Sequence, residues 1–220
     1  MNSPLQDQSS TAGSIARLRR FARKQTKQER CELCGLALGP EHQHLLDPPT
    51  RKLLCACEAC SLLFTSEPGT KLRRVPRRAR FLPDFKLSNS QWSELQIPIE
   101  LVFFFYSSPA EKTIAMYPSP AGATESLLPL DVWEEIVREN PALSEMTPDV
   151  EALLVSRVGA ERGFRPQYFI APIDECYRLA GLIRIHWRGL SGGTGVWREI
   201  TAFFSALKRK SGVSVESVHA

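Results

Sequence analysis

The sequence predicts an α+β protein: a small cysteine-rich N-terminal module, then an α+β domain with a small, mostly antiparallel sheet. Five of the six cysteines fall within 30 residues near the N-terminus. From residue 81 onward, short apolar runs rich in β-forming residues occur beside stretches with helical apolar periodicity. The charge divides in the same way. Residues 1–83 carry 15 Lys and Arg against 7 Asp and Glu, whereas residues 84–220 carry 13 against 17.

The N-terminal segment, residues 1–30, is expected to be flexible and basic. It includes a predicted short helix from Ser14 to Arg30, with Ser14 as the N-cap. No apolar core of a signal peptide follows Arg19 and Arg20. No apolar run approaches the ~20 residues that cross a bilayer. We therefore expect a cytoplasmic protein with no membrane span.

Residues 31–66 are predicted to form a four-cysteine metal-binding module. Cys31 and Cys34 form one CxxC pair, and Cys57 and Cys60 form a second pair after a 22-residue spacer. A two-residue spacer lets both sulfurs of a pair face one ion, and Gly35 lets the chain turn back beneath them. Two such pairs supply the tetrahedral thiolate set of structural zinc, and also of iron in rubredoxin-type centres. The spacing is zinc-ribbon-like or rubredoxin-like. Zinc is favoured over iron, because Ser61 follows the second pair where a rubredoxin-like site would have a glycine.

The choice of ligands has alternatives, because other metal-binding residues lie nearby. Cys55 could replace Cys57 or remain as a fifth, reactive thiol. His42 and His44 lie between the pairs, and His44 could replace one ligand. With four thiolates already present, we expect the two histidines to hydrogen-bond a sulfur or to cover the site.

Residues 67–80 are predicted to be a basic linker, and residues 81–210 the α+β domain. The linker holds six positive charges between Lys71 and Arg80, which is too basic for a core element. Within the domain, the apolar runs 99–107 and 112–117 predict neighbouring strands, residues 118–123 a loop, and residues 167–171 a further strand. The remaining ten residues, 211–220, are expected to be a flexible tail.

Four helices are predicted in the domain. The first follows Asp131 as N-cap and ends before Asn140 and Pro141. The second runs from Thr147, with Pro148 in its first turn, to about residue 158. The third begins at Asp174 and buries the side that carries Cys176 and Leu179. The fourth has the clearest apolar periodicity, from Val196 to Leu207.

The chain resembles an uncharacterised bacterial family whose genes lie beside those of uptake NiFe hydrogenases. The stretches that carry the likeness are CELCGLALGPEHQHLLD (31–47), LLCACEACSLLF (53–64), FFFYSSPAEKTIAMYPSPAGATESLL (103–128), PDVEALLV (148–155) and PIDECYRLAGLIRIHWRGLSGG (172–193), followed by GVW (195–197). The resemblance spans about residues 30–210. It implies an accessory protein for hydrogenase assembly, or a partner in its electron transfer, that binds a hydrogenase subunit or maturation factor. It implies no catalytic residue.

Three functions therefore compete. The first is a non-enzymatic metal-binding accessory protein, in which zinc, or alternatively iron, is held by Cys31, Cys34, Cys57 and Cys60. The second is a zinc-ribbon nucleic-acid-binding protein that uses the basic segments 17–30 and 71–80. The third is a thiol redox enzyme that uses Cys55 or Cys57 and needs a depressed thiol pKa. No set of nucleophile, base and oxyanion hole is visible, so an enzyme is the less favoured class.

Overall fold

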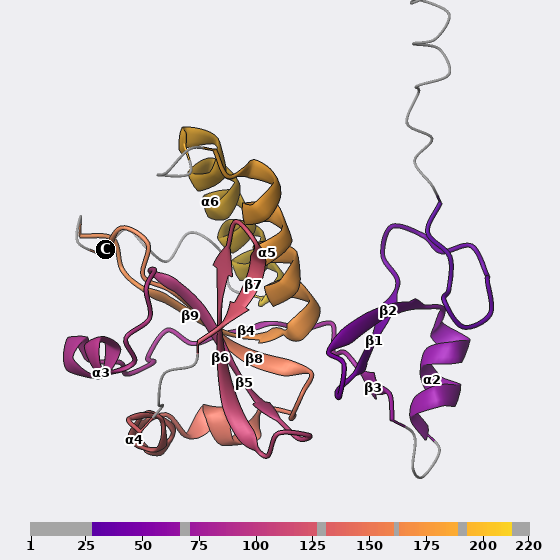
Figure 1. Ribbon diagram of the computed structural model, residues 1–220, viewed down its shortest axis with the longest axis horizontal. Helices are drawn as coiled ribbons and strands as arrows, with labels where there is room; N and C mark the ends of the chain where they lie inside the picture. The colour runs from indigo at the N-terminus through magenta and orange to yellow at the C-terminus, as the bar shows by residue number, and fades with distance from the viewer. Residues whose placement is uncertain (1–27, 67–70, 127–130, 161–162, 189–192, 213–220) are drawn as a thin grey trace, which may run out of the picture.

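Two antiparallel β-sheets organise the chain (Figure 1). The computed structural model describes residues 28–66, 71–126, 131–160, 163–188 and 193–212. One sheet has three strands in the order β2-β1-β3, and the other has six in the order β4-β9-β8-β5-β6-β7. All strand pairs within these residues are antiparallel. The prediction of a mixed fold with mostly antiparallel pairing is confirmed.

The N-terminal module contains a hairpin, a helix and a short returning strand. Its elements are β1 (Gln43–Asp47), β2 (Lys52–Ala56), α2 (Glu58–Ser66) and β3 (Arg73–Arg74). β3 lies in the segment expected to be a basic linker and pairs with β1. The same segment ends in β4 (Arg80–Phe81), which pairs with β9 of the larger sheet. The segment therefore adds a strand to each sheet as it crosses between them.

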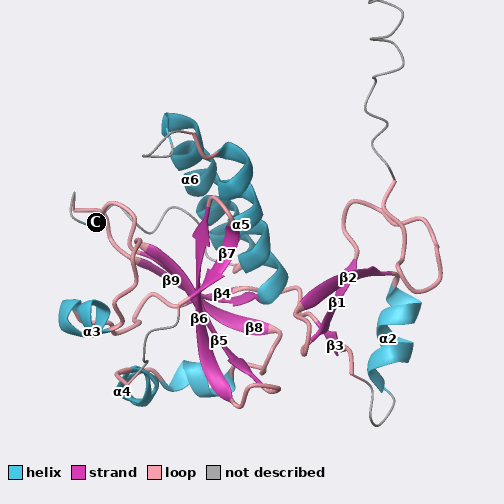
Figure 2. Ribbon diagram, viewed as in Figure 1, coloured by secondary structure: helices cyan, strands magenta, loops and turns pink. Residues whose placement is uncertain are grey.

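The larger sheet is covered by helices on both faces (Figure 2). Helices α5 and α6 pack on one face, and α3 and α4 on the other. The domain elements are α3 (Asn89–Glu94), β5 (Leu101–Ser107), β6 (Lys112–Ser119), β7 (Gly122–Glu125), α4 (Trp133–Glu139), the 3₁₀ helix η1 (Pro141–Glu145), β8 (Glu151–Ser156), β9 (Gln167–Pro172), α5 (Ile173–His186) and α6 (Gly193–Lys210).

The central strands are buried on both sides, and successive side chains enter different cores. On β5, Phe103 and Phe105 contribute to the core beneath α5 and α6. Val102 and Phe104 contribute to the core beneath α3 and α4. A strand covered on both faces has no polar alternation, which explains its continuous apolar run.

This double burial also explains why the helix predicted from Thr147 to about residue 158 is wrong. The segment holds strand β8, which pairs with β5 and β9. All four residues from Ala152 to Val155 are buried, so the run has neither strand nor helix periodicity to distinguish it. Asp149, with φ +69°, turns the chain into the strand where a helical cap was expected.

Smaller differences concern local signals. β7 occupies part of the predicted loop 118–123, and α3 was not predicted although Ser88 and Gln91 form a capping box at its start. Helix α4 has Val132, not Asp131, as its N-cap residue. Of the helix predicted from Ser14, only residues 28–30 are described, and residues 213–220 of the tail also lie outside the described chain.

The module and the domain are joined by both apolar and polar contacts. Leu46 of β1 and Val75 belong to the same buried cluster as the residues beneath α5 and α6. His44 lies 2.7 Å from the carboxylate of Asp174 in the first turn of α5, and Arg51 lies 2.8 Å from Glu125 of β7. Strand β1 is therefore shared between the two regions.

Candidate metal centre

The first CxxC pair lies on a tight turn before the hairpin. The N–H of Gly35 donates to the carbonyl of Cys31 at 2.8 Å, and the N–H of Cys31 donates to the carbonyl of Leu36, also at 2.8 Å. Gly35 has φ +77°, a backbone conformation that glycine adopts without a Cβ clash. The turn predicted around Gly35 is therefore present.

The second pair lies at the start of a helix. Cys57 directly follows β2, and Cys60 is in the first turn of α2. The N–H of Cys60 points to the sulfur of Cys57 at 3.4 Å. A helix start favours negative charge because its first N–H groups are unpaired and its dipole is positive there. The second pair thus differs from the first in how it presents its sulfurs.

Two hydrogen bonds between Glu32 and Cys55 hold the turn against the hairpin. The N–H of Glu32 donates to the carbonyl of Cys55 at 2.8 Å. The side chain of Glu32 in turn accepts from the N–H of Cys55 at 3.0 Å. This reciprocal pair brings Cys31 and Cys34 to the end of β2, where Cys57 follows.

The four sulfurs meet in one cluster. The Sγ atoms of Cys31, Cys34, Cys57 and Cys60 all lie within 4.8 Å of one another, and those of Cys34 and Cys57 are 3.8 Å apart. All four cysteines are free of disulfides. Sulfurs bound at ~2.3 Å to one tetrahedral ion would be separated by ~3.8 Å. The cluster therefore has the composition and approximate size of a four-thiolate metal site.

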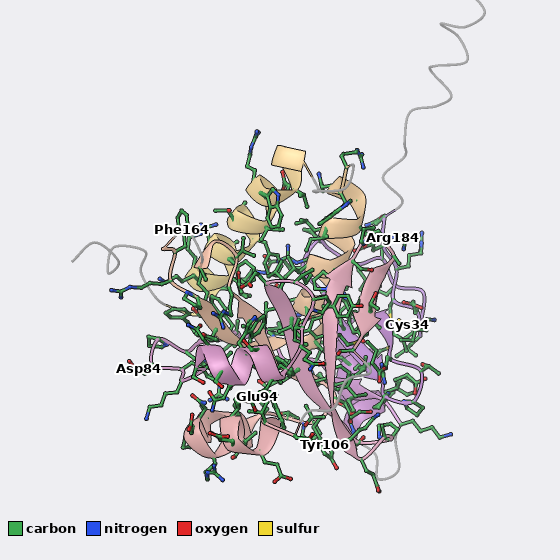
Figure 3. The ribbon with its side chains drawn as sticks, turned by 60° about the vertical axis from the view of Figure 1, so that its left-hand side comes forward. Cys34, Asp84, Glu94, Tyr106, Phe164 and Arg184 are labelled. Carbon is green, nitrogen blue, oxygen red and sulfur yellow. The ribbon has the colours of Figure 1, made fainter. Side chains whose placement is uncertain are left out.

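The cluster also makes up half of the module's buried core. Its buried residues are Cys31, Leu38, Leu45, Ala56, Cys57 and Cys60. Cys34 is the exposed member of the cluster and lies at the edge of the module (Figure 3). A core this small stabilises little by apolar burial alone, so a bound ion is the expected source of the module's stability.

The surroundings of Cys31 favour a thiolate. Burial opposes its ionisation, but N–H groups of Cys57, Cys34 and Leu33 point to its sulfur and lower its pKa to about 6. At the other end of the cluster, burial and the neighbouring cysteine sulfurs raise the pKa of Cys60 to about 12. An ion would displace the remaining thiol protons on binding, since zinc takes its cysteine ligands as thiolates.

A family model matches residues 30–211, which include both the cysteine module and the domain. The chain belongs to DUF5947, a family of unknown function. No curated protein and no solved structure matches the chain. The resemblance to an uncharacterised family is thus confirmed, and the hydrogenase context attached to it stays a prediction. Membership assigns no chemistry to any residue of this DUF5947 chain.

Cys55 does not join the four-sulfur cluster. It lies instead with His42 and His44 in a second group of three, whose ligand atoms are within 4.8 Å of one another. The two imidazoles bond to the carbonyl of Gly39 and to Asp174, not to a cysteine sulfur. The expectation was that they hydrogen-bond a sulfur or cover the site; the first alternative is not met among the described contacts, and the second stays a prediction. A separate group of His42, His44 and Cys55 was not expected from the sequence.

The pKa of the Cys55 thiol is shifted in the opposite direction from that of a redox-active cysteine. Burial, together with the carboxylates of Glu29 and Glu32, raises its pKa. A reactive cysteine needs a lowered pKa, so the Cys55 version of the thiol redox hypothesis loses support.

The basic segment 71–80 is partly neutralised within the chain. Arg74 and Arg77 pair with Glu58 of α2, and Arg80 pairs with Glu145 at 2.6 Å. These contacts reduce the charge that the segment offers to phosphates. The other basic segment falls almost wholly outside the described residues, so nucleic-acid binding stays an untested hypothesis.

A concave surface lies on the described part of the domain. A groove of about 710 Å³ runs beside α6, and its lining includes Ile99, Phe164, Trp187, Trp197 and Phe204. The side chains of Phe164 and Trp197 remain 67% and 41% exposed. Figure 3 shows Phe164 at the periphery of the domain beside α6.

Among the helices that the structure describes, none has the length and hydropathy to cross a membrane.

Proposed function

We propose that this protein is a non-enzymatic metal-binding accessory protein. The observation that carries the proposal is the convergence of four cysteine sulfurs within 4.8 Å from two separate chain segments. Such a closed thiolate set suits a structural or electron-transfer ion, because it leaves no ligand position for a substrate.

Zinc is the proposed ion, with iron as the alternative. Zn²⁺ accepts four thiolates in a tetrahedron and needs no second glycine-bearing turn. In this chain Ser61 follows the second pair, where a rubredoxin-like site has a glycine. Ser61 is fully buried in α2, and its hydroxyl donates to the carbonyl of Glu58 at 2.8 Å. The second pair is therefore continued by a helix and not by a glycine-bearing turn, which supports zinc over iron.

The proposed biological role is in NiFe hydrogenase assembly or electron transfer, in the cytoplasm. The support is the sequence resemblance to a family encoded beside uptake hydrogenases. The partner would be a hydrogenase subunit or a maturation factor. The groove beside α6 offers exposed aromatic side chains, Phe164 and Trp197, of the kind that protein partners bury.

A deletion strain tests this role. Loss of the gene should impair hydrogenase activity and leave unrelated metalloenzymes unaffected. Activity should return with the wild-type gene and with the control His186→Gln, whose histidine is exposed on α5. It should not return with Cys57→Ser. Unchanged hydrogenase activity in the deletion strain would contradict the role.

A further inference from the structure

A second group of metal-binding side chains lies on the β1–β2 hairpin, apart from the four-cysteine cluster. His44 of β1 and Cys55 of β2 are directly paired in the sheet register. His42 is two residues before His44, so the period of an extended chain brings it to the same face. The imidazole rings of His42 and His44 have centroids 4.8 Å apart. The hairpin therefore presents two nitrogens and one sulfur together.

The orientation of His42 leaves one ring nitrogen for a ligand. Its Nδ1 lies 3.0 Å from the carbonyl oxygen of Gly39, which only accepts hydrogen bonds, so Nδ1 carries the proton. The carboxylate of Glu29 is also 3.6 Å from Nδ1. In the neutral imidazole, Nε2 is then the acceptor. It is buried without a partner, on a side chain that is only 7% exposed. Buried polar atoms of this kind normally have a partner.

The domain orients His44 so that, as in His42, one ring nitrogen makes a hydrogen bond and the other is left for a ligand. Its Nδ1 lies 2.7 Å from Oδ2 of Asp174 on α5, so Nδ1 donates to a carboxylate and Nε2 is directed elsewhere. Asp174 is itself fixed, since its other oxygen accepts from the N–H of Glu175 at 2.8 Å. Metal-bound histidines usually donate their second N–H to a carboxylate or a backbone carbonyl. Both imidazoles here have that arrangement.

Charge around the group favours a cation. Glu32 lies beside the backbone of Cys55, Glu29 beside His42, and Asp174 beside His44. Lys52 neutralises part of this charge, since its Nζ lies 3.1 Å from Glu32. His44 and Cys55 are partly exposed, so the group is open to solvent on one side.

We propose that His42, His44 and Cys55 form a second metal site that binds a borderline transition-metal ion such as Zn²⁺. Two imidazoles and one thiolate suit such an ion, and three protein ligands leave a fourth position for water or an exogenous ligand. Asp174 acts as a positioning residue that orients His44. This site goes beyond the proposed function, because it is open and exchangeable where the four-cysteine site is closed.

The site also connects the two regions of the protein. Its ligands belong to the module, whereas Asp174 belongs to α5 of the domain. An ion bound by His44 strengthens the hydrogen bond from His44 to Asp174, since a metal-bound imidazole is a stronger N–H donor. Occupancy of the site is therefore linked to how firmly the module is held against the domain.

Cobalt titration of the full-length protein tests the site. Protein holding one Zn²⁺ per chain is titrated with Co²⁺ without oxygen, while released zinc is measured. We expect one Co²⁺ to bind without release of zinc, with a thiolate-to-cobalt charge-transfer band. Cys55→Ala should abolish the band, and His42→Gln and His44→Gln should abolish stoichiometric binding. Asp174→Asn should weaken binding by about 10- to 100-fold.

His186→Gln is the matched control and should bind like wild type. Each variant must retain one Zn²⁺, which shows that the four-cysteine module is still folded. The proposal is overturned if wild type binds no second ion or if Co²⁺ only displaces the first zinc. It is also overturned if the band persists in Cys55→Ala. The hydrogenase phenotype of a deletion strain does not bear on these outcomes, so the two proposals fail separately.

Discussion

The module and the domain are stabilised by different means. Half of the six buried core residues of the module are cysteines. The domain, by contrast, has two apolar clusters, one on each face of its sheet, built largely from aromatic and branched aliphatic side chains. Apolar burial therefore explains the fold of the domain but not that of the module, for which we propose a bound ion.

Removing the metal should have the largest effect, and it should be confined to the module. Structural zinc supplies about 10–16 kcal/mol of apparent binding free energy in small zinc domains. We expect Cys31→Ser with Cys57→Ser to abolish amide protection in residues 28–66. Hydrogen exchange should still show protected amides in β5 and β8 of the same sample. Equal loss of amide protection in both regions would contradict the claim that the metal stabilises the module alone.

Truncating the domain core should have the reverse effect. Phe169 is fully buried between Phe81 and Phe204, so Phe169→Ala should lower the free energy of unfolding of the domain by about 3–5 kcal/mol. Metal content should stay unchanged. Phe164→Ala, at a 67% exposed position, is the matched control and should change the unfolding free energy little. Denaturant unfolding with metal analysis measures both.

Leu46 tests where the module ends and the domain begins. It belongs to the module by sequence and to the domain by packing. It is 2% exposed and lies in the cluster beneath α5 and α6. Leu46→Ala should destabilise the domain by about 2–4 kcal/mol. The exposed Leu63→Ala on α2 should not. If Leu46→Ala released metal without destabilising the domain, β1 would belong to the module alone.

The smallest expected effect is at the ion pair between the regions. Arg51 and Glu125 are 2.8 Å apart, and each side chain is about 30% exposed. A double-mutant cycle with Arg51→Ala and Glu125→Ala should give a coupling free energy of about 0.2–1 kcal/mol, and less in high salt. A coupling near zero would mean that other described contacts join the regions, among them those of Leu46 and Val75 and the His44–Asp174 pair.

The sequence predicted those parts of the fold whose signals are local. The apolar period of α6 and the β-forming runs of β5 and β6 are visible within short windows. Strand β8 could not be recognised in this way. Burial on both faces removes its alternation of polar and apolar residues, and Thr147 with Pro148 resembles a helix start. Strand order also depends on pairing between distant segments, which no local window contains.

The site shows the same division. Each CxxC pair is a local motif, so the four cysteines that converge were identified from spacing alone. The second group depends on the register that places Cys55 opposite His44, and on Asp174, 130 residues away. The alternation of His42 and His44 was the available signal. It became meaningful only once β1 was known to be an extended strand.

X-ray absorption on the Cys55→Ala protein, purified without oxygen and without a chelating tag, is the direct test of the four-thiolate metal site. This variant lacks the second proposed site and keeps the four-cysteine cluster. We expect one ion per chain, zinc or iron, with four sulfur neighbours at ~2.3 Å. A chain without stoichiometric metal, or an ion with fewer than four sulfur neighbours, would contradict it.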